Sequence, residues 1–497
     1  MWYQLTNDKS PASQLDIFDP QRWGLRPEAI ADLGPRLYRL WRRYRPCFRT
    51  RTRDTSEHAH IYLRAQLTMD VERNFANIDR RLNGGDGQSL QHFMSNSPWP
   101  GVAVFGQIQA DLSAIPVLAQ GSVLILDESA DEKAGTDSVG AARQYNGRLG
   151  KVDVCRVDTC LTYANVAVGL WTMVDGELYL PKEWFTPDFA DQRQSLGVPD
   201  DRTFLRKTDL GLRMVQRAQA NGLPFERLVC DAFYGRDSRF RADLQAENVL
   251  YAADVPVNTS VYLQRPRVGV PKRRPAKGRT PTRWQVLSRQ RPHPVRALAH
   301  SRQTPWQRLQ VRPTERGWLE ADFTTRRVWT ITEAGQVREE WLVIRRDAED
   351  DYTYTLLNDT AETPVRQLVE ASCQRYFTER LFQDAKTEIG WDEFQAQKYR
   401  AWEHHLALTA LALWFVAQTK LEWREQYTRD PELARQLEVE VLPALSTANM
   451  RELLKAVLPL PDLTPEDAIQ IVTHMLVNRA RSTSSRLKAQ QQPEAPS

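Results

Sequence analysis

The sequence predicts an α/β protein whose core is interrupted by a β-rich insertion and flanked by helical regions at both ends of the chain. Three observations support this. A short, fully apolar run at residues 122–126 is typical of a buried strand, strand-like and helix-like patterns alternate after it, and a basic, proline-containing segment precedes a second group of strand-like runs. A chain of 497 residues is too long for one compact core, so we expect several structural units.

The composition is that of an ordinary soluble protein. Hydrophobic residues make up 41% and charged residues 26%, values that exclude neither enzymes nor binding proteins. The first residues lack the basic-then-apolar pattern of a signal peptide, and the longest apolar run, residues 406–417, is too short to span a bilayer and predicts a buried helix. Five scattered cysteines without CxxC spacing support neither a zinc site nor a disulfide framework. A cytoplasmic location is expected.

Residues 1–116 are expected to form a helical DNA-binding region. Apolar residues recur there at steps of three and four, which places them on one face of a helix. The residues of this stripe are Leu67, Val71, Phe75, Ile78 and Leu82. Arginines beside the stripe could contact DNA, or they could form the solvated face of a helical cap. Glycines at residues 84–87 end the predicted helix.

Residues 117–255 are expected to form the first part of the core. Strands are predicted at residues 122–126, 157–168, 170–180, 227–230 and 249–252, and helices at 206–220 and 238–247. Asp175-Gly176 has the composition of a hairpin turn within the third of these strands. Antiparallel strands followed by a strand–helix–strand unit are the sequence layout of a ribonuclease-H-like α/β core.

Residues 256–365 are expected to form a basic, β-rich insertion. Seven basic residues lie between Arg265 and Arg279, including Arg273 and Arg274, and three prolines and two glycines accompany them. Strand-like runs follow, punctuated by tryptophans. These side chains could contact DNA phosphates and stack on bases, or the tryptophans could be core residues. Residues 366–425 are expected to supply the closing helices of the core, and residues 426–497 a helical C-terminal region with a basic tail.

Two aspartates follow predicted core strands. Asp127 comes directly after the run 122–126, and Asp231 directly after the run 227–230. A carboxylate at the end of a buried strand is costly without a cation partner, and carboxylate oxygens suit hard divalent ions such as Mg²⁺. Two such ions could bracket a phosphodiester. For each aspartate alone, the start of a turn is the structural alternative.

A third carboxylate lies on a predicted helix. Arg375 and Glu379 are four residues apart, and Glu379 and Lys386 are seven apart, so one helix face carries all three. Glu379 could bind metal while Arg375 and Lys386 hold a DNA phosphate beside it. A surface salt-bridge ladder is the alternative interpretation.

The chain resembles the DDE transposases of bacterial insertion sequences, in the branch whose third carboxylate lies in a Tyr-x2-Arg-x3-Glu-x6-Lys signature. Arg375, Glu379 and Lys386 match this spacing, whereas Ser372 stands at the tyrosine position. Further motifs are similar to those of the insertion-sequence group numbered seven hundred and one: Gln91-His-Phe with Ser97-Pro-Trp99, Lys133-Ala-Gly135, Arg143-Gln-Tyr-Asn-Gly147 with Gly150-Lys151, Leu178-Tyr-Leu-Pro181 and Asp231-x2-Tyr-Gly235.

The resemblance implies a DNA transposase with Asp127, Asp231 and Glu379 as catalytic residues and metal ligands. It implies that two Mg²⁺ ions, or Mn²⁺ ions in their place, support cleavage by water at the ends of the element, after which the freed 3′-hydroxyls attack target DNA. The expected partners are double-stranded DNA, as terminal inverted repeats and target, and a second copy of the chain on that DNA. No membrane partner is expected, and the DNA-bound protein would be nucleoid-associated.

Several assignments have close alternatives. Neighbouring strand residues point to opposite faces, so only one of Asp127 and Glu128 should face the metals, and the resemblance selects Asp127. Four further basic residues near the first aspartate could hold DNA or could be solvated: Lys133, Arg143, Arg148 and Lys151. A ribonuclease-H-like nuclease without strand transfer, or a catalytically silent DNA-binding protein derived from a transposase, would fit the same residues. The basic insertion disfavours a glycoside hydrolase with paired carboxylates.

Overall fold

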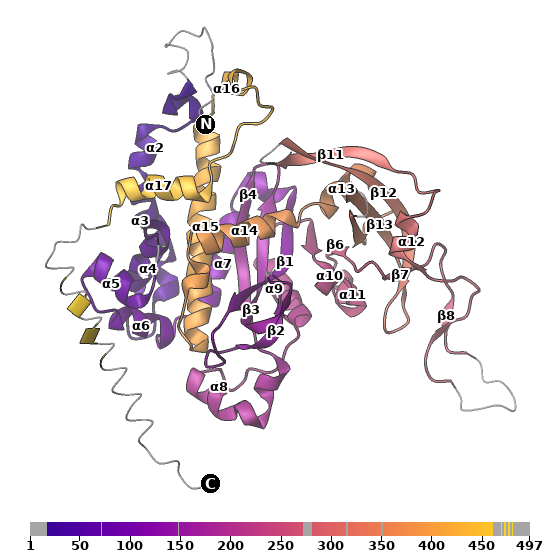
Figure 1. Cartoon of the computed structure of the whole chain (residues 1–497), viewed down its shortest axis with the longest axis horizontal. Coiled ribbons are helices and arrows are strands. Elements are labelled where there is room, and N and C mark those ends of the chain that lie inside the picture. Colours follow the sequence, from indigo (N-terminus) through magenta and orange to yellow (C-terminus); the bar gives the residue numbers. More distant parts are fainter. Residues whose placement is uncertain are drawn as a thin grey trace.

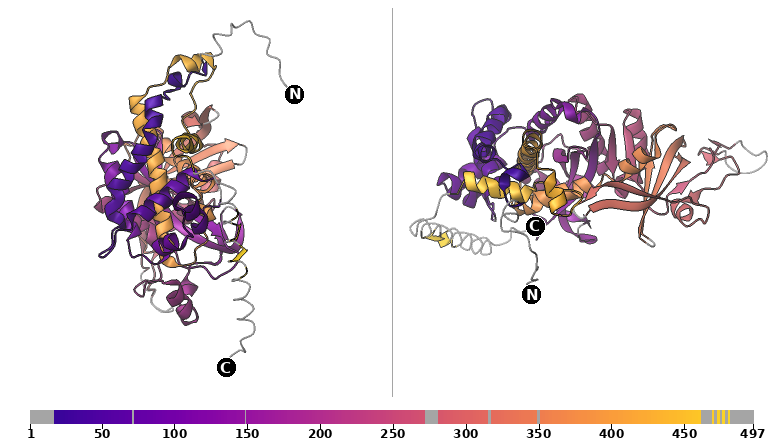
Figure 2. Two further views of the ribbon diagram at one scale, coloured as in Figure 1. Left: turned by 90° about the vertical axis from the view of Figure 1, so that its left-hand side faces the viewer. Right: turned by 90° about the horizontal axis from the view of Figure 1, so that it is seen from above.

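The computed structural model describes residues 17–70, 72–147, 149–271, 281–314, 317–348 and 351–460, together with isolated positions between 469 and 480. Helices of the N-terminal region, a central sheet with its covering helices, and the insertion lie in a row (Figure 1). The view from above in Figure 2 shows the same order, with α15 between the N-terminal helices and the sheet. The predicted mixed α/β fold with helical flanks is confirmed.

The N-terminal region is helical, as expected. Its helices are α2 (Pro27–Ala31), α3 (Leu33–Tyr44), α4 (Ser56–Thr68), α5 (Phe75–Asn83), α6 (Gln88–Ser95) and α7 (Gly101–Ser113). The prediction of one helix through Leu67 and Leu82 is wrong, because α4 ends at Thr68 and α5 begins at Phe75. The side chain of Asn74 accepts a hydrogen bond from the Asn77 main-chain N–H and so caps α5. Periodicity cannot detect a break that preserves the apolar stripe.

The central sheet has ten strands in the order β11-β12-β13-β14-β6-β5-β1-β3-β2, with β4 paired to β3. Its core strands are β1 (Ser122–Glu132), β2 (Ala142–Asn146), β3 (Lys151–Asn165), β4 (Leu170–Tyr179), β5 (Arg227–Cys230) and β6 (Leu250–Asp254). β1 pairs antiparallel to β3 and parallel to β5, and β5 pairs parallel to β6. The helices of this part are α8 (Ala190–Leu196), α9 (Lys207–Ala220), α10 (Ala232–Gly235) and α11 (Ser238–Ala246). This mixed sheet is consistent with the ribonuclease-H-like core that the sequence predicts.

The hairpin predicted at Asp175-Gly176 is wrong, because β4 runs through both residues. The turn lies instead at residues 166–169, where Gly169 has a positive φ of 60°. Asp175 is buried in a bidentate ion pair with Arg217, with contacts of 2.8 and 3.0 Å. A Cβ at position 176 would come within 2.7 Å of Leu406, so the glycine serves helix–sheet packing rather than a turn.

The insertion extends the central sheet. Its long strands are β11 (Gln307–Thr314), β12 (Gly317–Ile331), β13 (Val337–Ala348) and β14 (Asp351–Leu357), and β14 pairs antiparallel to β6. The shorter elements are β7 (Ser260–Val261), β8 (Val268–Gly269), β9 (Gln285–Val286), β10 (His293–Pro294) and α12 (Val295–Ala299). None of the five insertion tryptophans is fully buried, and the most exposed is Trp318 at 38%. The Arg346 and Arg327 guanidinium groups lie over the rings of Trp306 and Trp341 at 4.6 and 5.0 Å.

The chain returns to the core as helices α13 (Val365–Ser372), α14 (Tyr376–Thr387) and α15 (Tyr399–Gln426). Residues 406–417 of α15 are all buried, between the sheet and the N-terminal helices, which confirms the buried helix expected there. No helix among the described residues is both long and apolar enough to cross a membrane.

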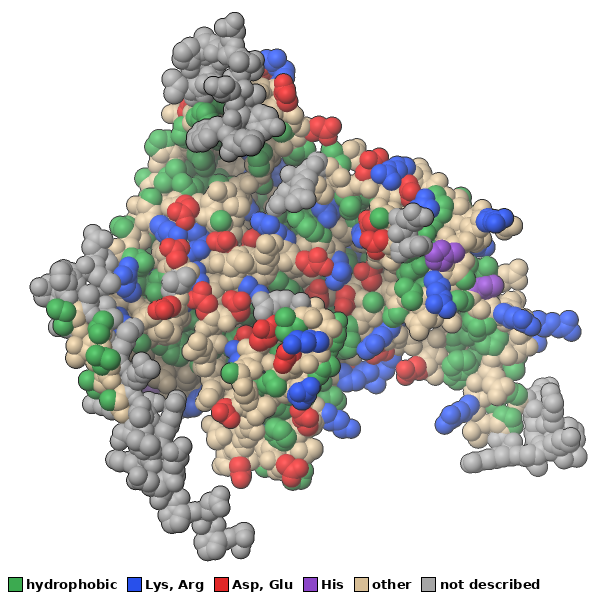
Figure 3. Space-filling model, in the orientation of Figure 1, with side chains coloured by type: hydrophobic (Ala, Val, Ile, Leu, Met, Phe, Trp, Pro, Cys, Tyr) green, Lys and Arg blue, Asp and Glu red, His purple; other side chains and the backbone are tan. Residues whose placement is uncertain are grey.

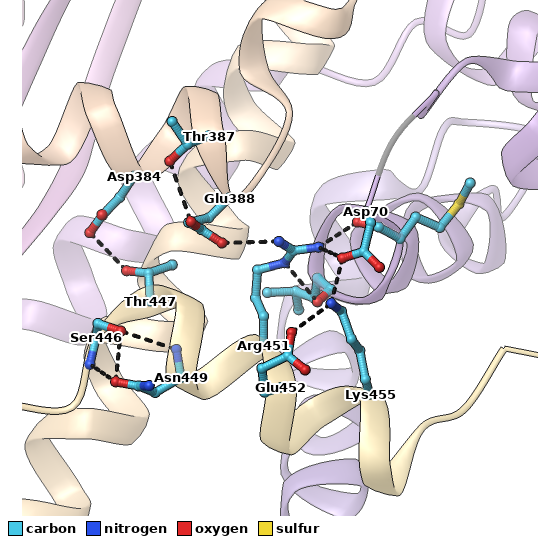
Figure 4. A network of polar contacts seen from close by, with 12 residues as sticks. Asp70, Asp384, Thr387, Glu388, Ser446, Thr447, Asn449, Arg451, Glu452 and Lys455 are labelled. Carbon is cyan, nitrogen blue, oxygen red and sulfur yellow. Dashed lines mark hydrogen bonds and ion pairs between the residues drawn. The ribbon is translucent and has the colours of Figure 1, made fainter. Parts of the chain in front are cut away.

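Helices α16 (Glu432–Gln436) and α17 (Thr447–Val457) complete the described C-terminal part. Arg451 of α17 donates to Glu388 at the end of α14 at 3.0 Å and also to the Leu67 and Met69 carbonyls at the end of α4 (Figure 4). Helix α17 therefore ties α14 to the N-terminal region. The expected basic tail lies almost entirely outside the described residues.

Candidate active site

Three aspartates lie at one level of the parallel part of the sheet. β1, β5 and β6 are in register, and the residue after the last paired position shared by the three strands is an aspartate in each of them. These residues are Asp127, Asp231 and Asp254. Because parallel strands in register bring corresponding residues together, Asp231 on the central strand is flanked by a carboxylate on either side.

Asp127 and Glu128 have different partners, as strand alternation requires. Asp127 faces Arg375, with 3.8 Å between the carboxylate and guanidinium groups. Glu128 forms an ion pair of 2.6 Å with Lys207 at the start of α9. Glu128 therefore already has its own cation, whereas Asp127 lies beside Asp231.

Asp231 is held by the helix that follows it. Its Oδ1 atom accepts hydrogen bonds from the main-chain N–H groups of Phe233 and Tyr234 at 3.0 and 3.3 Å, which makes Asp231 the N-cap of α10. Gly235 lets α10 approach β6, because a Cβ there would lie 1.9 Å from the Asp254 carbonyl oxygen. The Asp231-x2-Tyr-Gly235 motif thus builds a tight turn that fixes the direction of the aspartate.

Glu379 lies in the first turn of α14 and is the most exposed of the three predicted carboxylates, at 54%. Helix α14 is anchored on the sheet by a buried hydrogen bond of 2.8 Å between the hydroxyls of Thr378 and Thr162. The Arg375 guanidinium contacts the Glu379 carboxylate at 2.9 Å and so joins the helix to Asp127 and Asp254. The structure therefore brings Asp127, Asp231 and Glu379 to the place where the parallel pairing of β1, β5 and β6 ends. The prediction that a strand ends before Asp127 is wrong, because β1 continues through Asp127 to Glu132 in its pairing with β3.

The carboxylates repel one another in a buried setting. Burial, and then the charge of Asp231, raise the pKa of Asp127 to about 7, while Arg375 acts in the opposite direction. Burial also raises the pKa of Asp254 to about 6, against the lowering effect of a hydrogen bond from Thr355. The raised pKa values show that negative charge is unfavourable on these carboxyl groups. A cation bound between them would stabilise their charged forms.

The donor set fits Mg²⁺ in chemistry, because every candidate ligand is a carboxylate oxygen. Within the part of the chain that the structure describes, no three His, Cys, Asp or Glu side chains are already grouped as metal ligands would be. The Arg375 guanidinium lies between the carboxylates of Asp127, Asp254 and Glu379. The site therefore offers suitable ligands and one internal cation.

The other predicted DNA-contacting residues fall into three groups. Arg143 on β2 and Lys151 at the start of β3 are exposed, and Lys151 forms an ion pair with Asp153 at 2.9 Å. Lys133 and Lys386 are half-buried, and each donates to a main-chain carbonyl, at 3.3 Å (Phe394) and 3.1 Å (Ala130). The remaining three lie outside the described residues: Arg148, Arg273 and Arg274.

Sequence reasoning missed two features. Asp254 lies two residues beyond the predicted strand 249–252, and the repeated pattern of a strand followed by aspartate was the signal that could have found it. Eight arginines lie between Arg36 and Arg53, a stretch with no acidic residue. Among the described residues, neither Arg42 nor Arg51 of this set has an acidic partner, and both are exposed.

Comparisons with known proteins identify the family of this chain. The family described as DDE superfamily endonuclease matches residues 43–317, which include Asp127 and Asp231. The chain is also similar to a protein of Microchaete diplosiphon described as the probable transposase for insertion sequence element IS701, with 23% identity over 349 residues. That similarity covers 69% of this chain and 78% of the relative. Because the family match spans more than half of the chain, this protein is an enzyme that belongs to the DDE superfamily of endonucleases, as its sequence motifs predicted.

Proposed function

We propose that this protein is a DNA transposase that cleaves the ends of an insertion element by metal-dependent hydrolysis and joins the freed 3′-hydroxyls to target DNA. The observation that carries the proposal is the gathering of Asp127, Asp231 and Glu379 around Arg375, where the parallel pairing of the sheet ends, in a chain of the DDE superfamily. The similarity to a probable insertion-sequence transposase supports transposition in particular.

In this proposal Asp127, Asp231 and Glu379 hold two Mg²⁺ ions, with Mn²⁺ as a substitute. When bound, such ions activate water and neutralise charge on the phosphate. The chain itself positions the reacting groups. The hydrogen bonds at the N-terminus of α10 orient Asp231, and the Thr162–Thr378 hydrogen bond holds the helix that carries Glu379 against the sheet. The Arg375 guanidinium offers donors to phosphate oxygens.

Basic surfaces on both sides of the core support a long DNA path. The arginine-rich segment 36–53, which comprises most of α3 and the loop after it, lies in the N-terminal region. Eight exposed arginines of the insertion have no acidic partner among the described residues: Arg265, Arg267, Arg283, Arg289, Arg291, Arg296, Arg302 and Arg326. Figure 3 shows Lys and Arg side chains spread over the insertion side of the molecule. Arg143 and Lys151 lie exposed on the core between these regions, and Arg148, Arg273 and Arg274 are proposed to extend the path.

Lys133 and Lys386 are proposed to act differently from these arginines. Both were expected to contact DNA, but each side chain is directed to a carbonyl of the protein, and Lys133 also forms an ion pair with Asp131. They would support the strand that carries Asp127 while adding positive potential near DNA.

The proposed partners are double-stranded DNA, as terminal inverted repeats and target, and a second copy of the chain when two ends are held together. The proposed domains keep the limits 1–116, 117–255, 256–365, 366–425 and 426–497, with the first as a DNA-binding region. The proposed place of action is the bacterial nucleoid in the cytoplasm.

The test uses the full chain, linear DNA that carries the element ends, and Mg²⁺. We expect Asp231→Asn to abolish cleavage and to leave binding to the ends within twofold of the unsubstituted protein. Asp243→Asn is the matched control, since Asp243 pairs with Arg239 on the surface of α11. Cleavage by the Asp231 variant at the unsubstituted rate would overturn the assignment of the site.

A nuclease without strand transfer is the second candidate, because the matched family is described as an endonuclease. The same reaction with a supercoiled target plasmid separates the two functions. Joined products support transposition, and cleaved ends that are never joined support the nuclease. No cleavage by the unsubstituted protein, with intact end binding, would support a catalytically silent DNA-binding protein.

A further inference from the structure

We propose that Asp254, held by Thr355 of the insertion, is a positioning residue that sets the orientation of Arg375 over the carboxylates of the active site. The proposal rests on the proposed transposase function. In it, strand β14 of the insertion helps to position a side chain of the active site. It concerns a residue outside the three predicted catalytic carboxylates, Asp127, Asp231 and Glu379.

Arg375 directs each of its three nitrogen atoms to a different carboxylate. Its Nη2 lies 2.9 Å from Glu379, its Nη1 lies 3.8 Å from Asp127, and its Nε lies 3.7 Å from Asp254. A guanidinium group is planar and rigid, so one contact of 2.9 Å and two charge attractions at 3.7 and 3.8 Å together favour one position and one plane for it. Asp254 is the only one of the three that approaches from the Nε side.

Asp254 is itself fixed by the insertion. Its Oδ1 accepts a hydrogen bond of 2.7 Å from the Thr355 hydroxyl, and the two residues face each other in the antiparallel pair of β6 and β14. Thr355 is 1% exposed, so the hydroxyl has a fixed direction. Asp254 is the last residue of β6 before the insertion, and β14 is the last strand within it. The chain therefore leaves the core after Asp254, and the last strand of the insertion returns to pair beside that residue.

The negative charge of Asp254 needs its own explanation. A neutral asparagine could accept the Thr355 hydrogen bond equally well, without the cost of a partly buried charge. The nearby cations are Arg375 and Arg345, and Arg345 already forms an ion pair of 2.8 Å with Asp347. Arg375 is thus the group toward which the charge of Asp254 acts.

A double-mutant cycle tests whether Asp254 acts through Arg375. Asp254→Asn, Arg375→Gln and the double variant are compared with the unsubstituted protein for single-turnover cleavage of end DNA at saturating Mg²⁺. We expect Asp254→Asn to slow cleavage about tenfold or more, with the end-binding Kd within twofold and an unchanged thermal midpoint. In the Arg375→Gln background, Asp254→Asn should have no further effect.

Thr355→Val gives a second variant that leaves the charge of Asp254 in place, and we expect it to slow cleavage with the same dependence on Arg375. It decides the test if Asp254→Asn lowers the thermal midpoint. Asp351→Asn, at the exposed start of β14, is the matched control and should cleave normally.

The proposal would be overturned if the two substitutions slowed cleavage independently, so that their effects multiplied in the double variant. Normal cleavage by Asp254→Asn would also overturn it. If Asp231→Asn also cleaved normally, the proposed function would fail as well. Normal cleavage by the Asp254 variant beside an inactive Asp231 variant would reject the positioning role alone.

Discussion

His405 makes the stability of the fold dependent on pH. The side chain is buried in α15, its Nε2–H donates to the Trp391 carbonyl at 2.9 Å, and its Nδ1 accepts from the Tyr62 hydroxyl at 2.9 Å. Both ring nitrogens are satisfied in the neutral form. Burial lowers the pKa of His405 from 6.5 to about 3, so the folded protein resists a proton that the unfolded chain accepts.

The sign and size of the effect follow from linkage. The contribution of His405 is fully present above pH 6.5 and is lost as pH falls from 6.5 toward 3. Between pH 7.5 and pH 5.5 the unfolded chain gains about 1.4 kcal/mol from protonation of this ring, and about 1.4 kcal/mol more for each further unit of pH. His405 joins Tyr62 of α4 to the segment that follows α14. Protonation of its ring at low pH should therefore weaken the contact between the N-terminal region and α14, the helix that carries Glu379.

The assay is denaturant unfolding at pH 7.5 and pH 5.5 for the unsubstituted protein and for His405→Gln, whose amide can still donate to the Trp391 carbonyl. We expect the substituted protein to lose about 1.4 kcal/mol less free energy of unfolding between the two pH values. His92→Gln, at an exposed position of α6, is the control for loss of an imidazole. Equal losses in the unsubstituted protein and His405→Gln would refute the reasoning.

Three further predictions follow from packing and charge. Arg451→Met should lower the free energy of unfolding by about 3 kcal/mol, because buried carbonyls and Glu388 lose their donor, whereas Lys455→Met should cost less than about 1 kcal/mol in the same denaturation assay. Gly235→Ala should abolish cleavage, since its Cβ would meet the Asp254 carbonyl at 1.9 Å, whereas Gly106→Ala, with its first neighbour at 3.9 Å, should cleave normally. Arg42→Gln should weaken end binding and reduce the slope of log Kd against log salt by about 1, and an unchanged slope would remove Arg42 from the DNA path.

Local patterns in the sequence were enough to predict most elements of the core. The apolar run 122–126, the helix at 206–220 and the strand at 227–230 all appear in the structure, because each is specified by side chains within a few residues of one another. The same holds for the signature around Glu379, which a single helix turn brings together. Where a local pattern has two solutions, a tertiary contact can choose between them, as the packing of Leu406 does at Gly176.

The sequence by itself determined the family, the candidate triad and the helix face that carries Glu379. Only the tertiary structure decided which groups meet. Asp254 joins the site through strand register, and Lys133 and Lys386 bond to protein carbonyls that are distant in sequence. Arg375 reaches aspartates more than 100 residues away along the chain. Register and helix packing depend on residues far apart in sequence, so a pattern within one segment cannot reveal the contacts they create.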